Sequence, residues 1–177
     1  RKQKNPLHLC YCFTPMRYAW GCFDDYFGRV NIFFKILIRF FLKGLRRWDR
    51  ATAANVDHFV AISQHIRKRI RACYGRDSDV IYPPVNVQYY QPDHRVDRED
   101  FYLVVSALVP YKRVDLAVKA AKKIKKRLVV IGDGPQRRSL EDMAGEGTTF
   151  LGWQTDETLR DHYRRAKALL FPGEEDF

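Results

Sequence analysis

Two adjacent cations, Lys112 and Arg113, stand between an apolar run and a helical pattern in the stretch SALVPYKRVDLAV. The run FYLVVSA predicts a buried strand over 101–107, and VDLAVKAAKKIKK predicts a helix that begins at about Val114. The start of a helix favours an anion, because its N–H groups are unpaired and its dipole end is positive. A fixed ammonium or guanidinium there would reinforce a phosphate site. The alternative is a solvated Lys-Arg pair.

Three further turns carry groups that suit a nucleotide bearing a polar substituent such as a sugar. GDGPQ places Gly132 and Gly134 after an apolar run, where the backbone can approach a ligand closely. FLGW places Trp153 after the next run, and Glu175 follows the last one. The plainer explanations are a tight turn for the glycines and a core or rim position for the aromatic ring.

The spacing of these turns predicts that they meet at one edge of a sheet. Apolar runs alternate with helical patterns, which is typical of a doubly wound, Rossmann-like α/β fold. Ligands of such sheets bind in the loops beyond the carboxyl ends of the strands. The predicted strands are 101–107, 127–132, 148–152 and 167–173. The predicted helices are 114–126, 136–145 and 156–166, the first with Leu116, Ala117, Ala120, Ala121 and Ile124 on its packed side.

The first half of the chain predicts a separate α/β domain. Its expected strands are 7–13, 58–63 and 78–86, and its expected helices are 30–45, 48–57 and 64–75, the last ending at Gly75. Residues 14–28 are rich in aromatics and turn formers. Prolines and charges over 85–100 predict a linker between domains 1–84 and 101–177.

The composition predicts a packed protein with an anionic partner. There are 32 Lys and Arg against 21 Asp and Glu, a net charge of +11, and hydrophobic residues make up 46% of the chain. The four cysteines contain no C-x-x-C pair, so reduced core thiols are expected. The sequence contains no run of 18 apolar residues, so no membrane-spanning helix is predicted. Because the chain starts near a strand and stops in a site loop, we expect a fragment that is inactive alone.

The helix predicted over 30–45 has a basic stripe. Lys35, Arg39 and Lys43 recur every four residues, and the remaining surface is mostly Phe, Ile and Leu. The preferred interpretation is a helix that packs its apolar side in the core and turns the stripe to water. The alternative is an amphipathic helix that lies on an anionic membrane.

An ordered series of motifs resembles the family 4 retaining glycosyltransferases of the GT-B fold. The series is FVAISQHIRKRI, VIYPPVN, VVSALVPYKRVDLAV, VIGDGP, FLGW and ALLFPGEEDF. In addition, YCFTPMRYAW is similar to a bacterial subgroup that includes sugar transferases of cell-surface polysaccharide synthesis, mannosyltransferases among them. The resemblance covers nearly the whole chain.

The resemblance implies two Rossmann-like domains facing a cleft, with the donor bound mainly to the second. By this analogy Lys112 contacts the donor diphosphate and stabilises the leaving group, with Arg113 beside it and no essential metal. Glu175 would hold the hydroxyls of the donor sugar, while Trp153 and Gln154 would border the base. The donor would be GDP-mannose or a UDP-sugar, with mannose favoured, and no separate cofactor is expected.

Two positions depart from the family pattern, and they bear on catalysis. Ala107 stands where relatives often have an Arg, and Phe13 stands where many have a His near the reacting sugar. Arg17 and Tyr18 are candidates for the acceptor side of the cleft.

The sequence thus predicts a cytoplasmic hexosyltransferase acting on a saccharide or lipid-linked acceptor, peripheral on the inner membrane face if the basic helix binds lipid. The alternative is a non-catalytic Rossmann module that binds a nucleotide or polyanion. A nucleic-acid partner is disfavoured, since neither an aromatic–basic motif nor a helix-turn-helix pattern is present.

Overall fold

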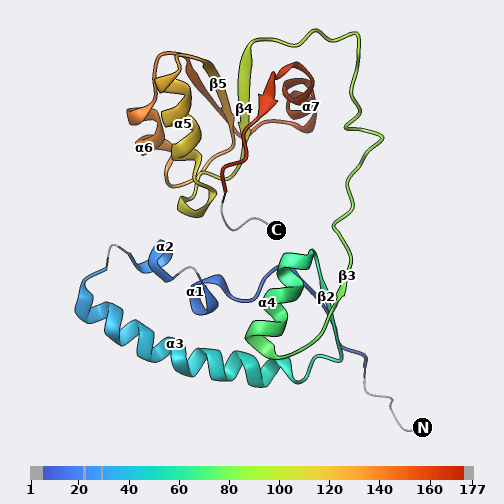
Figure 1. Ribbon diagram of the computed structural model, residues 1–177, viewed down its shortest axis with the longest axis vertical. Helices are drawn as coiled ribbons and strands as arrows, with labels where there is room; N and C mark the ends of the chain where they lie inside the picture. Colours follow the sequence, from blue (N-terminus) through green and yellow to red (C-terminus); the bar gives the residue numbers. More distant parts are fainter. Residues whose placement is uncertain (1–5, 22, 29, 174–177) are drawn as a thin grey trace. The chain divides into compact units, whose positions relative to one another are not determined.

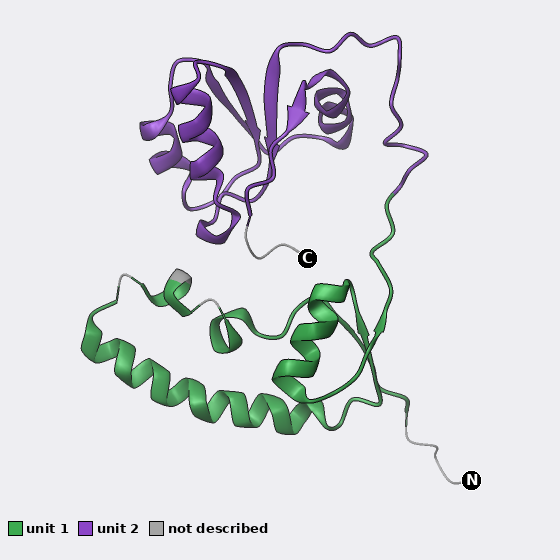
Figure 2. Cartoon of the chain, in the orientation of Figure 1, with its two compact units in different colours: residues 1–85, 177 green, residues 86–176 purple. Residues whose placement is uncertain are grey.

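The computed structural model describes residues 6–21, 23–28 and 30–173, and the chain forms two compact units. Unit 1 ends at Val85 and unit 2 begins at Asn86 (Figure 2). The elements of unit 1 are β1 (Leu9–Cys12), α1 (Arg17–Trp20), α2 (Phe23–Phe27), α3 (Ile32–Ala53), β2 (His58–Ala61), α4 (Gln64–Tyr74) and β3 (Asp79–Val80).

The three strands of unit 1 form a parallel sheet in the order β1-β2-β3. Helix α4 covers it through the buried side chains of Ile66 and Ile70, which pack against Phe59 of β2. The helix starts where Ser63 Oγ accepts a hydrogen bond from the Ile66 N–H, and it ends at Gly75 in the left-handed region, at φ 69°. The predicted stop at Gly75 is therefore confirmed.

Helix α3 corrects the prediction of two helices over 30–45 and 48–57. The structure has one helix of 22 residues that runs through Gly44 without a break. A lone glycine costs a helix only about 1 kcal/mol, and no proline interrupts the segment. The segment 14–28, expected to be turn-rich, forms the short helices α1 and α2.

Asp49 of α3 forms hydrogen bonds with residues of α1 and α4. Its Oδ2 accepts hydrogen bonds from Trp20 Nε1 at 2.7 Å and from the Tyr74 hydroxyl at 3.0 Å. Burial raises the pKa of Tyr74, and the bond to Asp49 raises it further. The Arg50 guanidinium lies 5.3 Å from the Trp20 ring centroid. This cluster fixes the side of α3 that packs on the unit.

Unit 2 alternates strands and helices as the sequence predicts. Its elements are β4 (Phe101–Val105), the 3₁₀ turn η1 (Pro110–Lys112), α5 (Val114–Lys123), β5 (Arg127–Ile131), α6 (Arg137–Met143), β6 (Thr148–Gly152), α7 (Asp156–Arg165) and β7 (Ala168–Leu169). The strands are parallel in the order β6-β5-β4-β7. Counted in chain order this is 3-2-1-4, which matches four of the six strands of the doubly wound order 3-2-1-4-5-6.

Helices cover both faces of this sheet (Figure 1). Helices α5 and α6 bury one face, where Val118 and Leu140 pack against Val104, Leu128 and Val130. On the other face, Phe101, Leu103 and Ile131 pack with residues of α7 such as Leu159. The central strands are therefore buried on both sides, which explains their continuous apolar runs.

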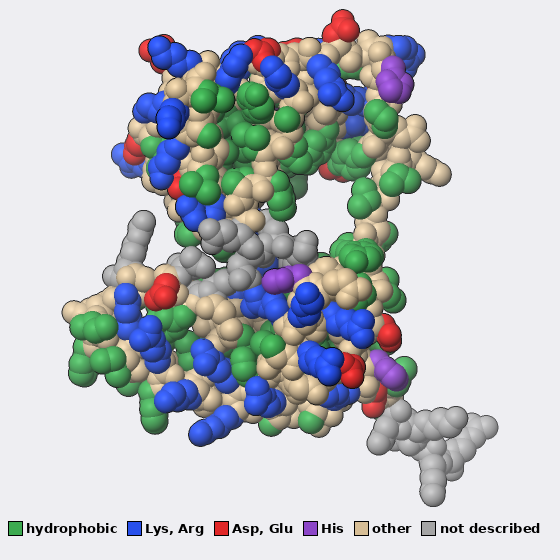
Figure 3. All heavy atoms as spheres, viewed as in Figure 1, with side chains coloured by type: hydrophobic (Ala, Val, Ile, Leu, Met, Phe, Trp, Pro, Cys, Tyr) green, Lys and Arg blue, Asp and Glu red, His purple; other side chains and the backbone are tan. Residues whose placement is uncertain are grey.

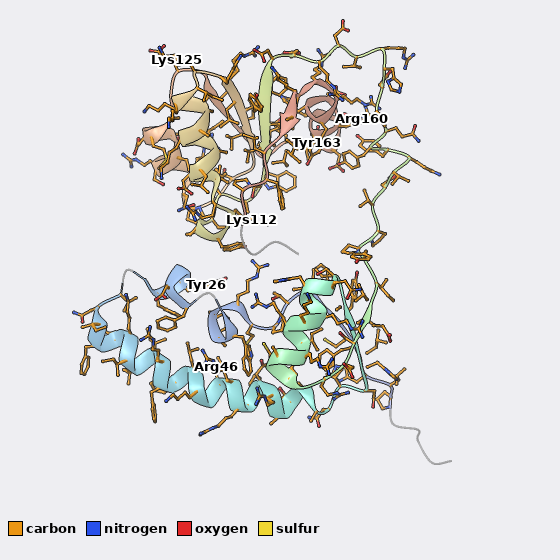
Figure 4. The ribbon with its side chains drawn as sticks, viewed as in Figure 1. Tyr26, Arg46, Lys112, Lys125, Arg160 and Tyr163 are labelled. Carbon is orange, nitrogen blue, oxygen red and sulfur yellow. The ribbon has the colours of Figure 1, made fainter. Side chains whose placement is uncertain are left out.

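Residues 86–100 contain no helix or strand, yet they pack against α7 (Figure 4). The Arg160 guanidinium lies 4.6 Å from the Tyr89 ring centroid, and the Tyr90 and Tyr163 rings meet edge to face at 6.1 Å. Arg164 Nε donates to the Gln91 carbonyl at 3.0 Å. The segment is thus a strap on unit 2.

Candidate functional site

The loops that follow β4, β5 and β6 meet at the carboxyl edge of the unit 2 sheet. They line an open pocket of about 280 Å³. Its lining is Val105, Ser106, Ala107, Ile131, Gly132, Asp133, Trp153, Gln154 and Leu159. Three predicted site residues therefore line one pocket: Gly132, Trp153 and Gln154. Ala107, which departs from the family pattern, lines it too. A small-molecule site at this edge requires such a grouping.

Close packing of two loops explains the glycines. Gly132 has φ 125°, and a Cβ built on it would lie 2.0 Å from the Ser106 carbonyl oxygen. A Cβ on Gly134 would lie 2.6 Å from the Leu108 carbonyl oxygen. The Leu108 N–H also donates to the Asp133 carbonyl at 2.9 Å. Both glycines therefore let the β4 and β5 loops touch, which fixes one wall of the pocket.

The β6 loop supplies an aromatic ring and an amide. The Trp153 side chain is 85% exposed, so its ring is available to stack on a planar group. Gln154 Nε2 donates to the Leu151 carbonyl at 2.7 Å, which anchors the amide close to the pocket wall. Since Val105, Ile131 and Leu159 give the pocket an apolar floor, a nucleobase suits it better than a highly charged group does.

Lys112 lies in the turn η1, beyond the carboxyl end of β4 (Figure 4). The Lys112 N–H donates to the Val109 carbonyl at 3.1 Å, which holds the turn. Its ammonium lies 5.8 Å from the Tyr111 ring centroid and 5.9 Å from the Phe171 ring centroid. Two aromatic faces thus position this cation. The sequence analysis missed Tyr111 and Phe171, although Phe171 stands in the quoted motif ALLFPGEEDF.

Arg113 occupies a strained backbone position at the start of α5. Its φ is 49° and its ψ is 34°, in the left-handed region that non-glycine residues rarely adopt. Its Nε pairs with Asp115 Oδ1 at 3.2 Å. Burial alone would raise the pKa of Asp115, but hydrogen bonds from Lys119 and Arg113 outweigh it and lower that pKa. Asp115, which the sequence analysis also missed, therefore positions Arg113.

Asp133 is a further pocket residue that the sequence analysis did not single out. Its Oδ1 accepts from the Gly134 N–H at 2.7 Å, and its Oδ2 lies 3.3 Å from Arg137 Nη1. Its position in the sequence could have marked it as a pocket residue, because Asp133 stands between the two predicted glycines. Among the described residues, no group of three or more His, Cys, Asp or Glu side chains could hold a metal ion.

The remaining candidates lie elsewhere. Glu175 falls outside the described residues. Arg17 and Tyr18 are on α1 of unit 1, where the Tyr18 hydroxyl contacts Met16 Sδ at 3.1 Å. Phe13 is exposed and meets the Tyr11 ring edge to face at 5.4 Å. The roles assigned to these residues stay predictions.

Comparison with known proteins finds a likeness in unit 2. Residues 89–176 match the family model described as Glycosyl transferases group 1. The match includes the whole pocket and the turn that carries Lys112.

A curated relative extends the likeness into unit 1. An uncharacterized glycosyltransferase of Methanocaldococcus jannaschii is 25% identical over 144 residues, covering 78% of this chain and 39% of the relative. The chain therefore spans well under half the length of this relative.

Two solved structures support the fold. One is AviGT4, a glycosyltransferase involved in avilamycin A biosynthesis, with TM-score 0.54, 25% identity, and coverage of 64% of this chain and 34% of that chain. The other is an S. aureus TarM mutant in complex with fondaparinux, alpha-GlcNAc-glycerol and UDP, with TM-score 0.51, 16% identity, and coverage of 65% and 26%. These likenesses confirm the predicted α/β fold with parallel sheets, of GT-B type.

Proposed function

We propose that the protein transfers a hexosyl group from a nucleoside-diphosphate sugar to a saccharide or lipid-linked acceptor, with retention of configuration. Mannose from GDP-mannose is the favoured donor, and a UDP-sugar is the other candidate. The observation that carries the proposal is the pocket at the carboxyl edge of unit 2, within the residues that match the model of Glycosyl transferases group 1. The complex of TarM with UDP is in keeping with a nucleotide donor.

Each side chain has a role in this proposal. Trp153 stacks on the base and Gln154 borders it. Lys112 binds the diphosphate and stabilises the negative charge that develops on it as the sugar leaves. Arg113, held by Asp115, reinforces the same charge together with the N-terminus of α5. With these two cations the reaction needs no divalent metal, and a cytoplasmic location would give access to the nucleotide sugar.

The second candidate is a Rossmann module that binds a nucleotide or polyanion without catalysis. Two observations favour it: Ala107, a pocket residue, stands where relatives often have Arg, and Phe13 stands where many have His. Both substitutions remove polar groups that the family resemblance associates with the reaction.

The test compares Lys112→Ala with Lys123→Ala in the intact protein. Lys123 is an exposed lysine in the last turn of α5, so it matches the charge change away from the pocket. We expect Lys112→Ala to lower kcat for sugar transfer about 100-fold or more, as the loss of one stabiliser of transition-state charge does, while Lys123→Ala retains activity. Circular dichroism checks that both variants stay folded.

The outcomes separate the two functions. Nucleoside diphosphate binding that depends on Lys112, without transfer from any donor by the wild type, would support the binding module. Equal transfer by both variants would overturn the assignment of Lys112.

A further inference from the structure

Phe171 is an exposed aromatic residue whose ring lies near the Lys112 cation. Its side chain is 63% exposed, so the ring is not part of the core of unit 2. Exposed rings also occur on α3, which, like every described helix, is not long and apolar enough to cross a membrane. The Phe171 ring differs from those, because its centroid lies 5.9 Å from Lys112 Nζ, within the range of a cation–π interaction. A ring that the core does not need, beside a cation of the candidate site, indicates a role in that site.

The strand pairing of unit 2 brings Phe171 close to Lys112. Strand β7 pairs with β4, with Leu169 opposite Leu103, and the Leu170 N–H donates to the Leu103 carbonyl at 2.8 Å. The Leu170 side chain also packs against the core formed with α5 and α6. Phe171 follows directly, at the same edge of the sheet as η1. The sheet therefore fixes the backbone on which this ring stands.

The side chain of Lys112, rather than its backbone, is the part that needs positioning. The Lys112 N–H donates to the Val109 carbonyl and the Arg113 N–H donates to the Pro110 carbonyl, each at 3.1 Å, so the turn η1 is fixed. The ammonium ends a flexible four-carbon stem, which loses much rotamer freedom when it is held in one place. The Tyr111 ring centroid, 5.8 Å from Lys112 Nζ, supplies a second aromatic face. Rings that restrict this stem in advance reduce the entropic cost of binding a ligand.

An aromatic face is well suited to hold a cation that has to bind phosphate. The ring attracts an ammonium through its quadrupole but carries no net charge. A carboxylate in its place would repel the phosphate. At the end of unit 2 where Figure 4 labels Lys112, the surface carries Lys and Arg side chains with hydrophobic side chains beside them (Figure 3). The two rings thus position Lys112 without adding negative charge to the site.

We propose that Phe171 and Tyr111 are positioning residues that hold the Lys112 ammonium where the donor diphosphate binds. Phe171 thereby couples the segment after β7 to phosphate binding, because its backbone belongs to that segment. Neither ring contacts the diphosphate itself, and both act through Lys112. The proposal rests on the proposed function for the role of Lys112 and extends that function to the two rings.

The experiment compares two kinds of ligand by NMR titration of the intact protein. GDP and UDP carry the diphosphate, whereas guanosine and uridine carry the base and ribose alone. We expect Phe171→Leu and Tyr111→Leu each to weaken diphosphate binding about two- to fivefold, the effect of one exposed cation–π contact, and to leave nucleoside binding unchanged. Phe171→Tyr keeps a ring and should bind as the wild type does. General damage to the pocket would weaken both kinds of ligand alike.

A double-mutant cycle tests whether Phe171 acts through Lys112. In the Lys112→Ala background, Phe171→Leu should have no further effect on diphosphate affinity, or on kcat where transfer is measured. The matched control is Phe40→Leu, the same change at an exposed phenylalanine of α3, which should bind as the wild type does. Because Phe171 and Phe40 are both exposed, the variants should keep the fold, and thermal melts check this.

The outcomes separate this proposal from the proposed function. A loss from Phe171→Leu that also affects nucleosides, or that persists in the Lys112→Ala background, would overturn the positioning role. So would unchanged diphosphate affinity in both ring variants. Diphosphate binding that depends on the rings and on Lys112, without transfer from any donor, would keep the positioning role and reject the transfer function. No diphosphate binding by the wild type would overturn both.

Discussion

The two units of this chain use similar elements in opposite ways. In unit 2, apolar runs are buried between helices and the charges nearly balance, so the exposed groups of interest are confined to one sheet edge. In unit 1, the longest helix leaves its Phe side chains exposed, and residues 1–85 hold almost the whole net charge. The contrast is clearest for unit 2, where the small-molecule site that we propose is confined to one edge of the sheet.

A pair of glycine substitutions should change the stability of the two units in opposite directions. Gly132→Ala should destabilise unit 2 by about 3 kcal/mol or more, because the new Cβ meets the Ser106 carbonyl oxygen at 2.0 Å on a backbone with φ 125°. Gly44→Ala in α3 should instead stabilise unit 1 by about 0.5–1 kcal/mol, since nothing lies within 4 Å of the added Cβ. Urea denaturation followed by circular dichroism measures both. A tolerated Gly132→Ala would show that the two loops need not touch.

A second pair tests which apolar residues form a core. Leu103 in β4 is fully buried, so Leu103→Ala should lower the free energy of unfolding by about 2–5 kcal/mol. Phe40→Ala should change it by about 0.5 kcal/mol or less, because this ring stands in solvent. Urea denaturation followed by circular dichroism measures the free energy of unfolding of both variants. A large loss from Phe40→Ala would mean that this ring packs within the protein.

The smallest effect concerns the carboxylate that holds Arg113. Asp115→Asn should lower the stability of unit 2 by about 0.5–1 kcal/mol at neutral pH, through lost pairing and a lost negative charge in the first turn of α5. The folded-state pKa of Asp115 is lowered from 3.8, so its contribution is present above that value and disappears as the pH falls further. Thermal melts of both proteins across this range should converge in acid. A constant difference would exclude ionisation of Asp115 as the cause.

The sequence predicted the order of strands and helices in unit 2 because buried parallel strands read as continuous apolar runs. The packed side of α5 was predicted less well. Leu116 and Ile124 are exposed, whereas Val114 and Val118, absent from the predicted side, are fully buried. Two adjacent sides of this helix are both apolar, so periodicity alone could not choose between them. Only the sheet, built from distant segments, decides which side is covered.

For the candidate site, too, the sequence predicted the positions of residues better than their contacts. Gly132, Trp153 and Gln154 could be placed at one edge from their positions after strands. The contacts that orient the cations, Asp115 to Arg113 and the Tyr111 and Phe171 rings to Lys112, depend on side-chain geometry that no spacing rule supplies. For α3 the preferred interpretation placed the apolar side in the core, but Phe33, Phe40 and Phe41 are exposed, whereas Arg39 and Lys43 of the basic stripe face water as predicted. A periodic pattern shows that two sides differ but not which one meets the protein.

The most direct test of the central claim is an NMR titration of the ¹⁵N-labelled protein with GDP and with UDP. The account predicts that amide shifts change at Ser106, Gly132 and Trp153, around the pocket, while the amides of α3 stay unchanged. The contradicting result is a response centred on the basic surface of unit 1, or on Lys122–Arg127 near Lys125, at the end of unit 2 opposite Lys112 (Figure 4). Either would show that the nucleotide follows positive charge, and that the pocket at the sheet edge is not its site.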